Sequence, residues 1–270
     1  MSEPLLRVEG LAGGYDPVQI FQDISLAMPA DASIGLFGPN GHGKSTFLRT
    51  LSGLIDPWRG DIHFAGERLN LPGERGSRRF RNFNYDAVQR RRMNPKQVAR
   101  AGLIHVPQSN LLFPEMTVEE TLSVAPAAAC GRGDPAALFD QVHRLFPRVY
   151  ERRFHKIRFL SGGERQMVAI GVGLMAAPKL LILDEPTLGL SPKLRHELCE
   201  AIQKIRASGV PLLLVDQDVE FLQSLIDTLY LFDHGRISRR IEKAEMPSHD
   251  EIMSMLFGEP AGGLGIGNGG

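Results

Sequence analysis

The residues with the clearest chemical potential form one glycine-rich run, Gly38-Pro39-Asn40-Gly41-His42-Gly43-Lys44-Ser45, which Thr46 follows. Two glycines bracketing four residues, then Gly-Lys-Ser, match a phosphate-binding pattern. Glycine is needed because a β-carbon would keep the backbone N–H groups away from the phosphates. The Lys44 ammonium can reach the terminal phosphates, and the Ser45 hydroxyl can ligate Mg²⁺. The run therefore predicts binding of a nucleoside triphosphate. A chance glycine-rich turn is the weaker alternative.

The segments on either side of this run must position it. Residues 33–37 form a short apolar run that predicts a buried strand, and residues 46–51 predict the first turns of a helix. A strand, a glycine turn and a helix place a row of N–H groups and a positive helix end around one anion. This context favours the phosphate-binding interpretation.

Two carboxylates end a second apolar run. Residues 180–183 lead directly into Asp184 and Glu185. A continuous apolar run suits a strand that is covered on both faces of a parallel sheet, where ligands gather at the carboxyl ends of strands. Asp184 can hold Mg²⁺, directly or through water, and Glu185 can orient and polarise an attacking water. Two adjacent acids alone are weak evidence for a catalytic site, but two that follow a phosphate loop in the sequence are strong evidence.

Two glutamines end further predicted strands. Residues 102–107 lead to Gln108, and residues 211–216 lead to Gln217. In a parallel core Gln217 should face the γ-phosphate. Because an amide can donate a hydrogen bond but cannot titrate, we expect Gln217 to position the phosphate and not to transfer a proton. The alternative is a strand-end glutamine that caps a loop.

The segment before the glycine-rich run predicts two strands, at residues 5–11 and 20–28, joined by a turn cluster at residues 13–17. Tyr15 lies in that cluster. It can stack on a purine, because stacking on an exposed ring does not depend on the precise geometry of the surrounding residues. Alternatively, it is an ordinary turn tyrosine. The spacing does not decide between the two.

The composition indicates a soluble globular protein. The chain has 270 residues, of which 43% are hydrophobic and 23% charged, and a formal net charge of zero, which gives no bias toward nucleic acid or anionic membranes. No signal peptide is recognised at the start, and apolar runs such as residues 211–215 are too short to span a bilayer. Cys130 and Cys199 match no metal-ligand spacing and predict reduced thiols of a cytosolic protein.

We predict one domain over residues 1–257, with a helical subdomain inserted at about residues 109–168. Thr117 with Glu120 fits a capping box, so a helix should begin there. Residues 258–270 are rich in glycine and predict a disordered tail.

A second insertion, at about residues 72–94, is rich in arginine. The favoured interpretation is a solvated surface loop. The functional alternatives are contact with an acidic protein face, with lipid headgroups or with RNA. The arginines are Arg75, Arg78, Arg79, Arg81, Arg90, Arg91 and Arg92.

Four motifs in this order and spacing resemble the nucleotide-binding subunit of an ABC transporter. They are the glycine-rich run, Gln108, the Leu-Ser-Gly-Gly-Glu segment at residues 160–164, and the Leu-Asp-Glu-Pro segment at residues 183–186. The resemblance covers residues 5 to about 241. It implies an α/β fold: a P-loop NTPase core with a mostly parallel sheet, an antiparallel β part and a helical subdomain.

The resemblance also implies an ATPase that uses ATP and Mg²⁺, with Glu185 and Gln217 as catalytic residues. Tyr15 would stack on adenine, and Gln108 would sense Mg²⁺ and the membrane partner. The other implied ATP contacts are Gly38, Pro39, Asn40, Gly41, His42, Gly43, Lys44, Ser45 and Thr46. Implied Mg²⁺ ligands are Ser45, Gln108 and Asp184. Ser161, Gly162, Gly163 and Gln166 would contact ATP held by an opposite subunit, which implies a dimer.

Residues 113–120, 185–192 and 213–217 resemble, more narrowly, importers of branched-chain amino acids, a family that also serves urea and short amides. That family uses two different ATPase subunits, and this chain resembles the smaller one. The implied partners are integral-membrane permease subunits, a second ATPase subunit, identical or related, and a periplasmic or extracellular solute-binding protein, without nucleic acid. The implied place is the cytoplasmic face of the cell membrane. Most ABC ATPases have histidine where Gln217 stands and aspartate where Ser191 stands.

Other functions stay open at this point. A soluble ABC protein on ribosomes usually carries two such modules, and one acting on DNA carries long heptad insertions, which are not visible here. An exporter ATPase would share the same motifs. A P-loop phosphotransferase would not need the segment at residues 160–164.

Overall fold

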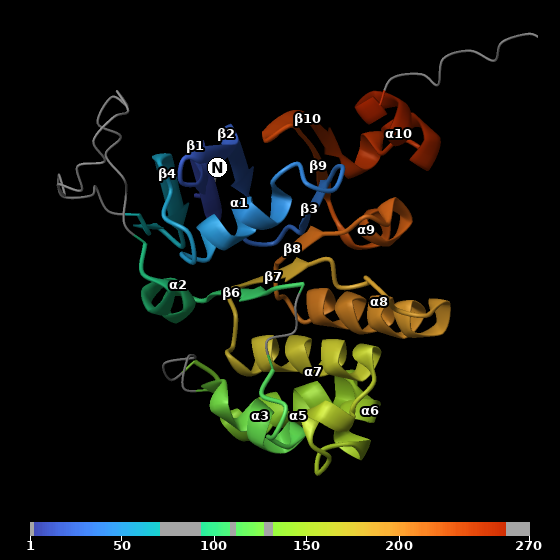
Figure 1. Cartoon of the computed structure of the whole chain (residues 1–270). Helices are drawn as coiled ribbons and strands as arrows, with labels where there is room; N and C mark the ends of the chain where they lie inside the picture. The colour runs from blue at the N-terminus through green and yellow to red at the C-terminus, as the bar shows by residue number, and fades with distance from the viewer. Residues whose placement is uncertain (1–2, 71–92, 109–111, 127–131, 258–270) are drawn as a thin grey trace, which may run out of the picture.

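The computed structural model describes residues 3–70, 93–108, 112–126 and 132–257, and Figure 1 shows their arrangement. The predicted tail and residues 72–92 of the arginine-rich insertion lie outside the described residues. The strands form a four-stranded sheet, in the order β2-β1-β4-β5, and a six-stranded sheet, in the order β10-β9-β3-β8-β7-β6. Their bounds are β1 Leu6–Tyr15, β2 Val18–Met28, β3 Ile34–Phe37, β4 Arg59–Phe64, β5 Glu67–Arg68, β6 Leu103–Val106, β7 Leu180–Asp184, β8 Leu212–Val215, β9 Thr228–Asp233 and β10 Arg236–Glu242.

Some helices pack on the larger sheet and others form a separate group beyond α7 (Figure 1). Their bounds are α1 Lys44–Leu51, α2 Pro95–Ala101, α3 Val118–Val124, α5 Pro135–Leu145, α6 Pro147–Glu151, α7 Gly162–Met175, α8 Pro192–Ala207, α9 Val219–Leu225 and α10 His249–Phe257, with short 3₁₀ turns at Ile157–Phe159 and Lys243–Glu245. In the part of the chain that is described, no helix combines the length and the apolar character needed to cross a membrane.

The larger sheet is mostly parallel, as predicted. Strand β3, which leads into the glycine-rich run, pairs in parallel with β8 on one side and β9 on the other. Strand β7 pairs in parallel with β6 and β8, and only β10 runs antiparallel at one edge. The carboxyl ends of β3, β6, β7 and β8 therefore meet along one edge of the sheet.

Apolar side chains of β7 pack on both faces of the sheet, which explains why its sequence does not alternate. Leu180 and Ile182 belong to a cluster with α1 and the antiparallel sheet. Leu181 and Leu183 belong to a second cluster with α7, α8 and α9. All four side chains are fully buried, so the strand end that carries Asp184 is held rigidly.

The helical subdomain, here α3, α5 and α6, packs on α7, which separates it from the sheet (Figure 1). The predicted start of α3 is confirmed. The Thr117 hydroxyl accepts a hydrogen bond from the Glu120 main chain at 3.2 Å, and the Thr117 N–H donates to the Glu120 carboxylate at 2.7 Å. This reciprocal pair satisfies two N–H groups that the helix leaves open.

One local prediction is wrong, and one helix was not predicted. The predicted turn cluster at residues 13–17 is mostly strand, because β1 stays paired with β2 until Tyr15 lies opposite Val18. Only Asp16 and Pro17 form the turn. Helix α10 is missing from the prediction, although Ser248 and Glu251 form a capping box at its start, with distances of 2.7 and 3.4 Å between their main-chain N–H groups and the partner side chains.

Candidate nucleotide-binding site

The glycine-rich loop is shaped by close approach to β9 and by a left-handed turn. A β-carbon on Gly38 would lie 1.9 Å from the main-chain oxygen of Phe232, so no other residue fits. Gly43 has φ 102° and precedes α1 without any side-chain cap. The first N–H groups of α1 are therefore open toward the loop, the arrangement that binds phosphate.

The Lys44 side chain is buried inside this loop. Its ammonium donates to the main-chain oxygens of Gly38, at 2.6 Å, and Pro39, at 2.9 Å. Burial lowers the pKa of Lys44, and the nearby carboxylates of Glu185 and Asp184 oppose that effect. The ammonium is thus a positive charge with low hydration at the centre of the loop, which strengthens its attraction for phosphate.

Ser45, in the first turn of α1, and Asp184, at the end of β7, bring two oxygens together. The Ser45 hydroxyl donates to Asp184 Oδ1 at 3.2 Å. Asp184 is 2% exposed, and this burial raises its pKa to about 6, which the bond from Ser45 partly opposes. Hydroxyl and carboxylate oxygens are the donors that Mg²⁺ takes in proteins.

Glu185 lies just past β7 in a conformation that glutamate rarely adopts. Its φ is 49°, in the left-handed region, and its N–H donates to the main-chain oxygen of Val215 at 2.7 Å. Such a backbone persists only where the surrounding structure holds it, and it is enriched at functional sites. The neighbouring strand β8 therefore fixes where the Glu185 carboxylate points.

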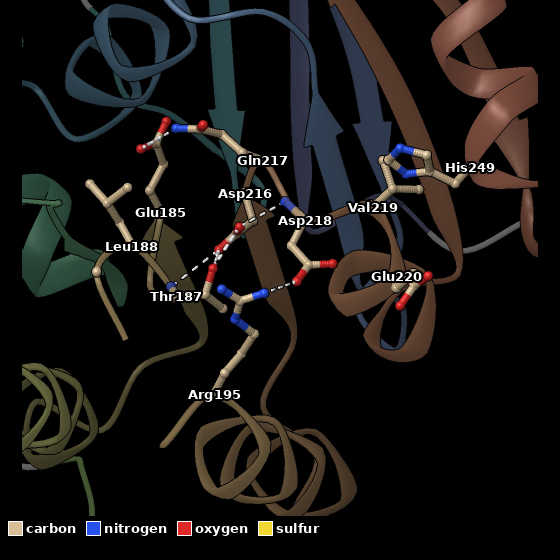
Figure 2. A pocket seen from close by; sticks show the side chains of 11 residues that line it. Glu185, Thr187, Leu188, Arg195, Asp216, Gln217, Asp218, Val219, Glu220 and His249 are labelled. Carbon is tan, nitrogen blue, oxygen red and sulfur yellow. Dashed lines mark hydrogen bonds and ion pairs between the residues drawn. The ribbon is translucent and has the colours of Figure 1, made fainter. Parts of the chain in front are cut away.

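Two glutamine amides converge on one oxygen of Glu185. Gln108 Nε2 donates to Glu185 Oε2 at 2.8 Å, and Gln217 Nε2 donates to the same oxygen at 2.9 Å. Figure 2 shows the contact from Gln217. Within the described ranges, Oε1 receives no hydrogen bond. One oxygen is therefore held by the residues that follow β6 and β8, and among the described residues the other has no such donor.

A pocket of about 410 Å³ adjoins Glu185 and lies over the ends of β7 and β8 (Figure 2). At its base the Thr187 hydroxyl donates to the buried Asp216 carboxylate at 2.8 Å. At its rim Arg195 and Asp218 form an ion pair at 2.8 Å. Burial raises the pKa of Asp216. These contacts join the turn after Glu185 to the turn that carries Gln217, a connection that the sequence analysis did not find.

The predicted signature residues lie elsewhere, at the start of α7. Ser161 caps the helix, with its hydroxyl accepting from the Glu164 main chain at 3.2 Å. Ser161 and Gly162 are exposed, whereas Gly163 and Gln166 are buried. A β-carbon on Gly163 would lie 2.6 Å from Leu194 Cδ1, whereas one on Gly162 would meet nothing within 4 Å. Among the described residues, none of these four forms a hydrogen bond with the glycine-rich loop.

The remaining predicted contacts lie around the loop. Tyr15 ends β1, is 46% exposed, and its hydroxyl accepts from Arg49 on α1 at 3.0 Å. Asn40 and Gly41 are exposed, and Thr46 is buried in the first turn of α1. His42 contacts the turn between β9 and β10, at Asp233 and His234, a neighbourhood that the sequence analysis missed because those residues are far apart in the chain.

A glycine-rich phosphate loop after a central parallel strand, beside a buried acid at the end of a second parallel strand, defines a P-loop nucleotide-binding ATPase. Residues 21–188 match a family model described as "ABC transporter". The chain therefore belongs to the ABC transporter family and is an ATPase subunit, in which ATP hydrolysis is coupled to transport.

Curated relatives cover most of the chain. It is 32% identical to the high-affinity branched-chain amino acid transport ATP-binding protein BraG of Pseudomonas aeruginosa, over 94% of this chain and 100% of that protein. It is 29% identical to a probable branched-chain amino acid transport ATP-binding protein, LivF, of Archaeoglobus fulgidus, over 94% of this chain and 99% of that protein. It is also 32% identical to the Nod factor export ATP-binding protein I of Ralstonia nicotianae, over 92% and 70%.

Solved structures confirm the predicted fold. A structure described as the ATP binding subunit of an ABC transporter has a TM-score of 0.75 and 27% identity, covering 93% of this chain and 99% of that one. An ATP-binding cassette in its ADP conformation has a TM-score of 0.70 and 20% identity, covering 94% of this chain and 95% of that one. This second likeness shows the fold alone.

Proposed function

We propose that this subunit energises the import of a small polar solute of the branched-chain amino acid, urea or amide type. The observation that carries the proposal is the full-length similarity to BraG, which spans all of that protein. The LivF relative supports the same class of solute, again over nearly its whole length. The narrower motifs at residues 113–120 and 185–192 agree with it.

ATP binding rests on the phosphate loop. The open N–H groups at the start of α1 and the buried Lys44 ammonium attract the phosphates. Tyr15, exposed beside α1, stacks on the adenine ring. The neighbours Pro39, Asn40, Gly41 and Thr46 line the path of the phosphates, because they share the loop and its helix turn.

The residues fit a Mg²⁺ ion. Ser45 and Asp184 supply hard oxygen donors 3.2 Å apart, and Gln108, which donates to the adjacent Glu185, carries an amide oxygen that could be a further ligand. Burial raises the pKa of the Asp184 carboxyl, and a bound cation would favour its charged form. A bound Mg²⁺ would neutralise charge on the phosphates.

In hydrolysis, Glu185 orients the attacking water and accepts its proton. Its free oxygen, Oε1, is available for that water, while Gln108 and Gln217 hold Oε2. The left-handed backbone and the bond to Val215 keep the carboxylate fixed, so little reorganisation is needed at the moment of reaction. Gln217 acts as a neutral donor that positions Glu185 and the γ-phosphate.

The site is completed by a second ATPase subunit. Ser161 and Gly162 are exposed at the N-terminus of α7 and do not reach the phosphate loop of their own chain. We infer that this end of α7 contacts the γ-phosphate of ATP on the other subunit. The assembly includes integral-membrane permease subunits and a solute-binding protein outside the membrane, and the subunit works at the cytoplasmic face.

Export is the second candidate. The Nod factor export relative has the same identity as BraG, but this chain spans only 70% of its length. The shared motifs serve hydrolysis and do not set the direction of transport.

The test is uptake into vesicles that contain the purified complex of this subunit with its co-purifying membrane protein. We expect ATP-dependent accumulation of one of leucine, urea or acetamide on the side that contains ATP, and none with Lys44→Ala. Accumulation on the opposite side would favour export. Failure to purify with any integral membrane protein would contradict the transport role.

A further inference from the structure

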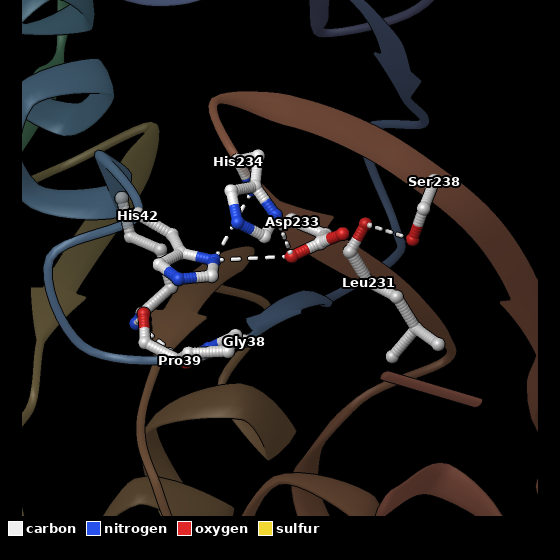
Figure 3. A network of polar contacts seen from close by, with 8 residues as sticks. Gly38, Pro39, His42, Leu231, Asp233, His234 and Ser238 are labelled. Atoms are coloured by element: carbon white, nitrogen blue, oxygen red, sulfur yellow. Dashed lines mark hydrogen bonds and ion pairs between the residues drawn. The ribbon is translucent and has the colours of Figure 1, made fainter. Parts of the chain in front are cut away.

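Three side chains that can bind metal gather where the phosphate loop meets the turn between β9 and β10 (Figure 3). They are His42 from the loop, Asp233 at the end of β9 and His234 in the turn, and one ligand atom of each lies within 4.8 Å of the others. His42 Nδ1 is 3.1 Å and His234 Nδ1 is 2.7 Å from Asp233 Oδ1. Two imidazole nitrogens thus converge on a single carboxylate oxygen.

Hydrogen bonds do not satisfy this cluster in its neutral form. The main-chain N–H of His234 points at His42 Nδ1 from 3.1 Å, which requires a lone pair on that nitrogen. The Asp233 carboxylate, at the same distance from the same nitrogen, requires a proton there. A neutral imidazole nitrogen offers one or the other. A cation between His42 Nδ1 and Asp233 would take the place of the proton that their contact otherwise needs.

We propose that His42, Asp233 and His234 form a site for a divalent transition-metal ion of the Zn²⁺ type. Two imidazoles and one carboxylate are a donor set that suits Zn²⁺ and not Mg²⁺. Tetrahedral Zn²⁺ with ligands at about 2.0–2.1 Å holds its donor atoms roughly 3.3 Å apart. The observed separations of 2.7 and 3.1 Å need to open only slightly.

The backbone already holds the two segments together. The Gly235 N–H donates to the main-chain oxygen of His42 at 3.1 Å, so the loop and the turn stay in register without metal. The two rings lie with their centroids 4.4 Å apart. The His234 side chain is 81% exposed and the His42 side chain 22% exposed, so the site opens to solvent and keeps room for a water ligand.

The position of the proposed metal site links it to the phosphate loop. His42 lies two residues before Lys44, in the loop that holds phosphate. A metal ion bound by His42 ties this loop to the end of β9. Metal binding at His42 therefore restrains the conformation of the phosphate loop.

The test measures Zn²⁺ and Co²⁺ binding by the full chain without nucleotide or Mg²⁺. Zn²⁺ affinity comes from competition with a chromophoric chelator, and the geometry comes from the visible absorption of bound Co²⁺. The main variant is His234→Asn, because His234 has φ 43° and asparagine tolerates that backbone. Asp233→Asn removes a second ligand independently. His196→Asn is the matched control, since His196 is an exposed histidine paired with Glu200 on α8.

We expect the wild type and His196→Asn to bind one Zn²⁺ per chain with equal affinity and to give a Co²⁺ spectrum of low coordination number. Both His234→Asn and Asp233→Asn should weaken Zn²⁺ binding by about tenfold or more and abolish that spectrum. Unfolding curves recorded without metal verify that each variant is folded. Equal Zn²⁺ affinity in the wild type and the folded His234→Asn variant, or no binding by the wild type, would overturn the proposal.

Discussion

The strand-end cluster around Glu185 and the start of α7 differ in where their polar groups find partners. In the cluster, Ser45 bonds to Asp184, and two glutamine amides bond to Glu185, all within the chain. At the start of α7, the partners of Ser161 and Glu164 are one turn away, and Gly162 is exposed. The first region is assembled by the fold, whereas the second leaves the exposed N-terminus of a helix that is capped only by its own first turn.

The physical reason lies in topology. Parallel strands bring side chains that are far apart in sequence to one sheet edge, so the cluster forms as soon as β3, β6, β7 and β8 pair. A helix N-terminus satisfies only some of its N–H groups by capping. We therefore expect changes in the cluster to act on chemistry within one chain, and changes at the start of α7 to act on assembly.

The largest effect should follow from Glu185→Gln, which keeps the shape and removes the charge. Hydrolysis should fall by roughly 10²–10⁴-fold while ATP binding persists, because the base that accepts the proton of water is lost. Phosphate release and equilibrium ATP binding measure the two quantities, and a stable ATP-bound dimer should appear. The control is Glu220→Gln. Glu220 is another carboxylate that lines the same pocket, and this change should leave hydrolysis unchanged. Normal turnover in Glu185→Gln would remove this residue from the mechanism.

A smaller effect is expected from the glutamines. Gln217→Ala or Gln108→Ala leaves the other amide on Glu185 Oε2, so each change should slow turnover by about tenfold. In the double variant Glu185 Oε2 loses both donors, and neither can compensate for the other. Turnover should therefore fall by more than the two single effects combined. Gln217→His should stay active, with a new pH dependence from the imidazole. A fully active Gln217→Ala enzyme would contradict a role in hydrolysis.

Acid should destabilise the strand that carries Gln108. Burial lowers the pKa of His105, on β6, from 6.5 to about 4, and its Nε2 has no partner among the described residues. The unfolded chain binds this proton below pH 6.5 and the folded chain only below about 4. Stability should therefore fall as pH drops through that window, by up to roughly 3 kcal/mol. Denaturant unfolding at several pH values measures it, with His105→Gln as the comparison. An identical acid profile in that variant would contradict the assignment.

Much of the strand-end cluster could be predicted from the sequence, because motif residues fall at the ends of apolar runs. The pattern places Ser45, Asp184 and Glu185 on one sheet edge without any knowledge of strand order. It does not tell that Gln108 and Gln217 meet on one oxygen of Glu185, since that depends on β6 and β8 flanking β7.

Other features depend on contacts between distant segments and could not be predicted. The pairs Thr187–Asp216 and His42–Asp233 carry no local signature, because their spacing in the chain is arbitrary. Gly163 is a related case. The motif gives it the same standing as Gly162, but packing against Leu194 buries it, so a substitution there would disturb α8 as well as any contact with ATP.

The most direct test of the account compares Gly162→Asp with Lys44→Ala. ATP affinity is measured on the isolated chain and the ATPase rate on the assembled transporter. Gly162→Asp has room for its side chain, should keep ATP affinity within about twofold, and should lose hydrolysis by roughly 10²-fold or more, because its charge repels the γ-phosphate of the other subunit. Lys44→Ala should lose both. A Gly162→Asp chain that binds ATP as poorly as Lys44→Ala would show that the start of α7 serves its own phosphate loop, and would contradict the division between the two regions.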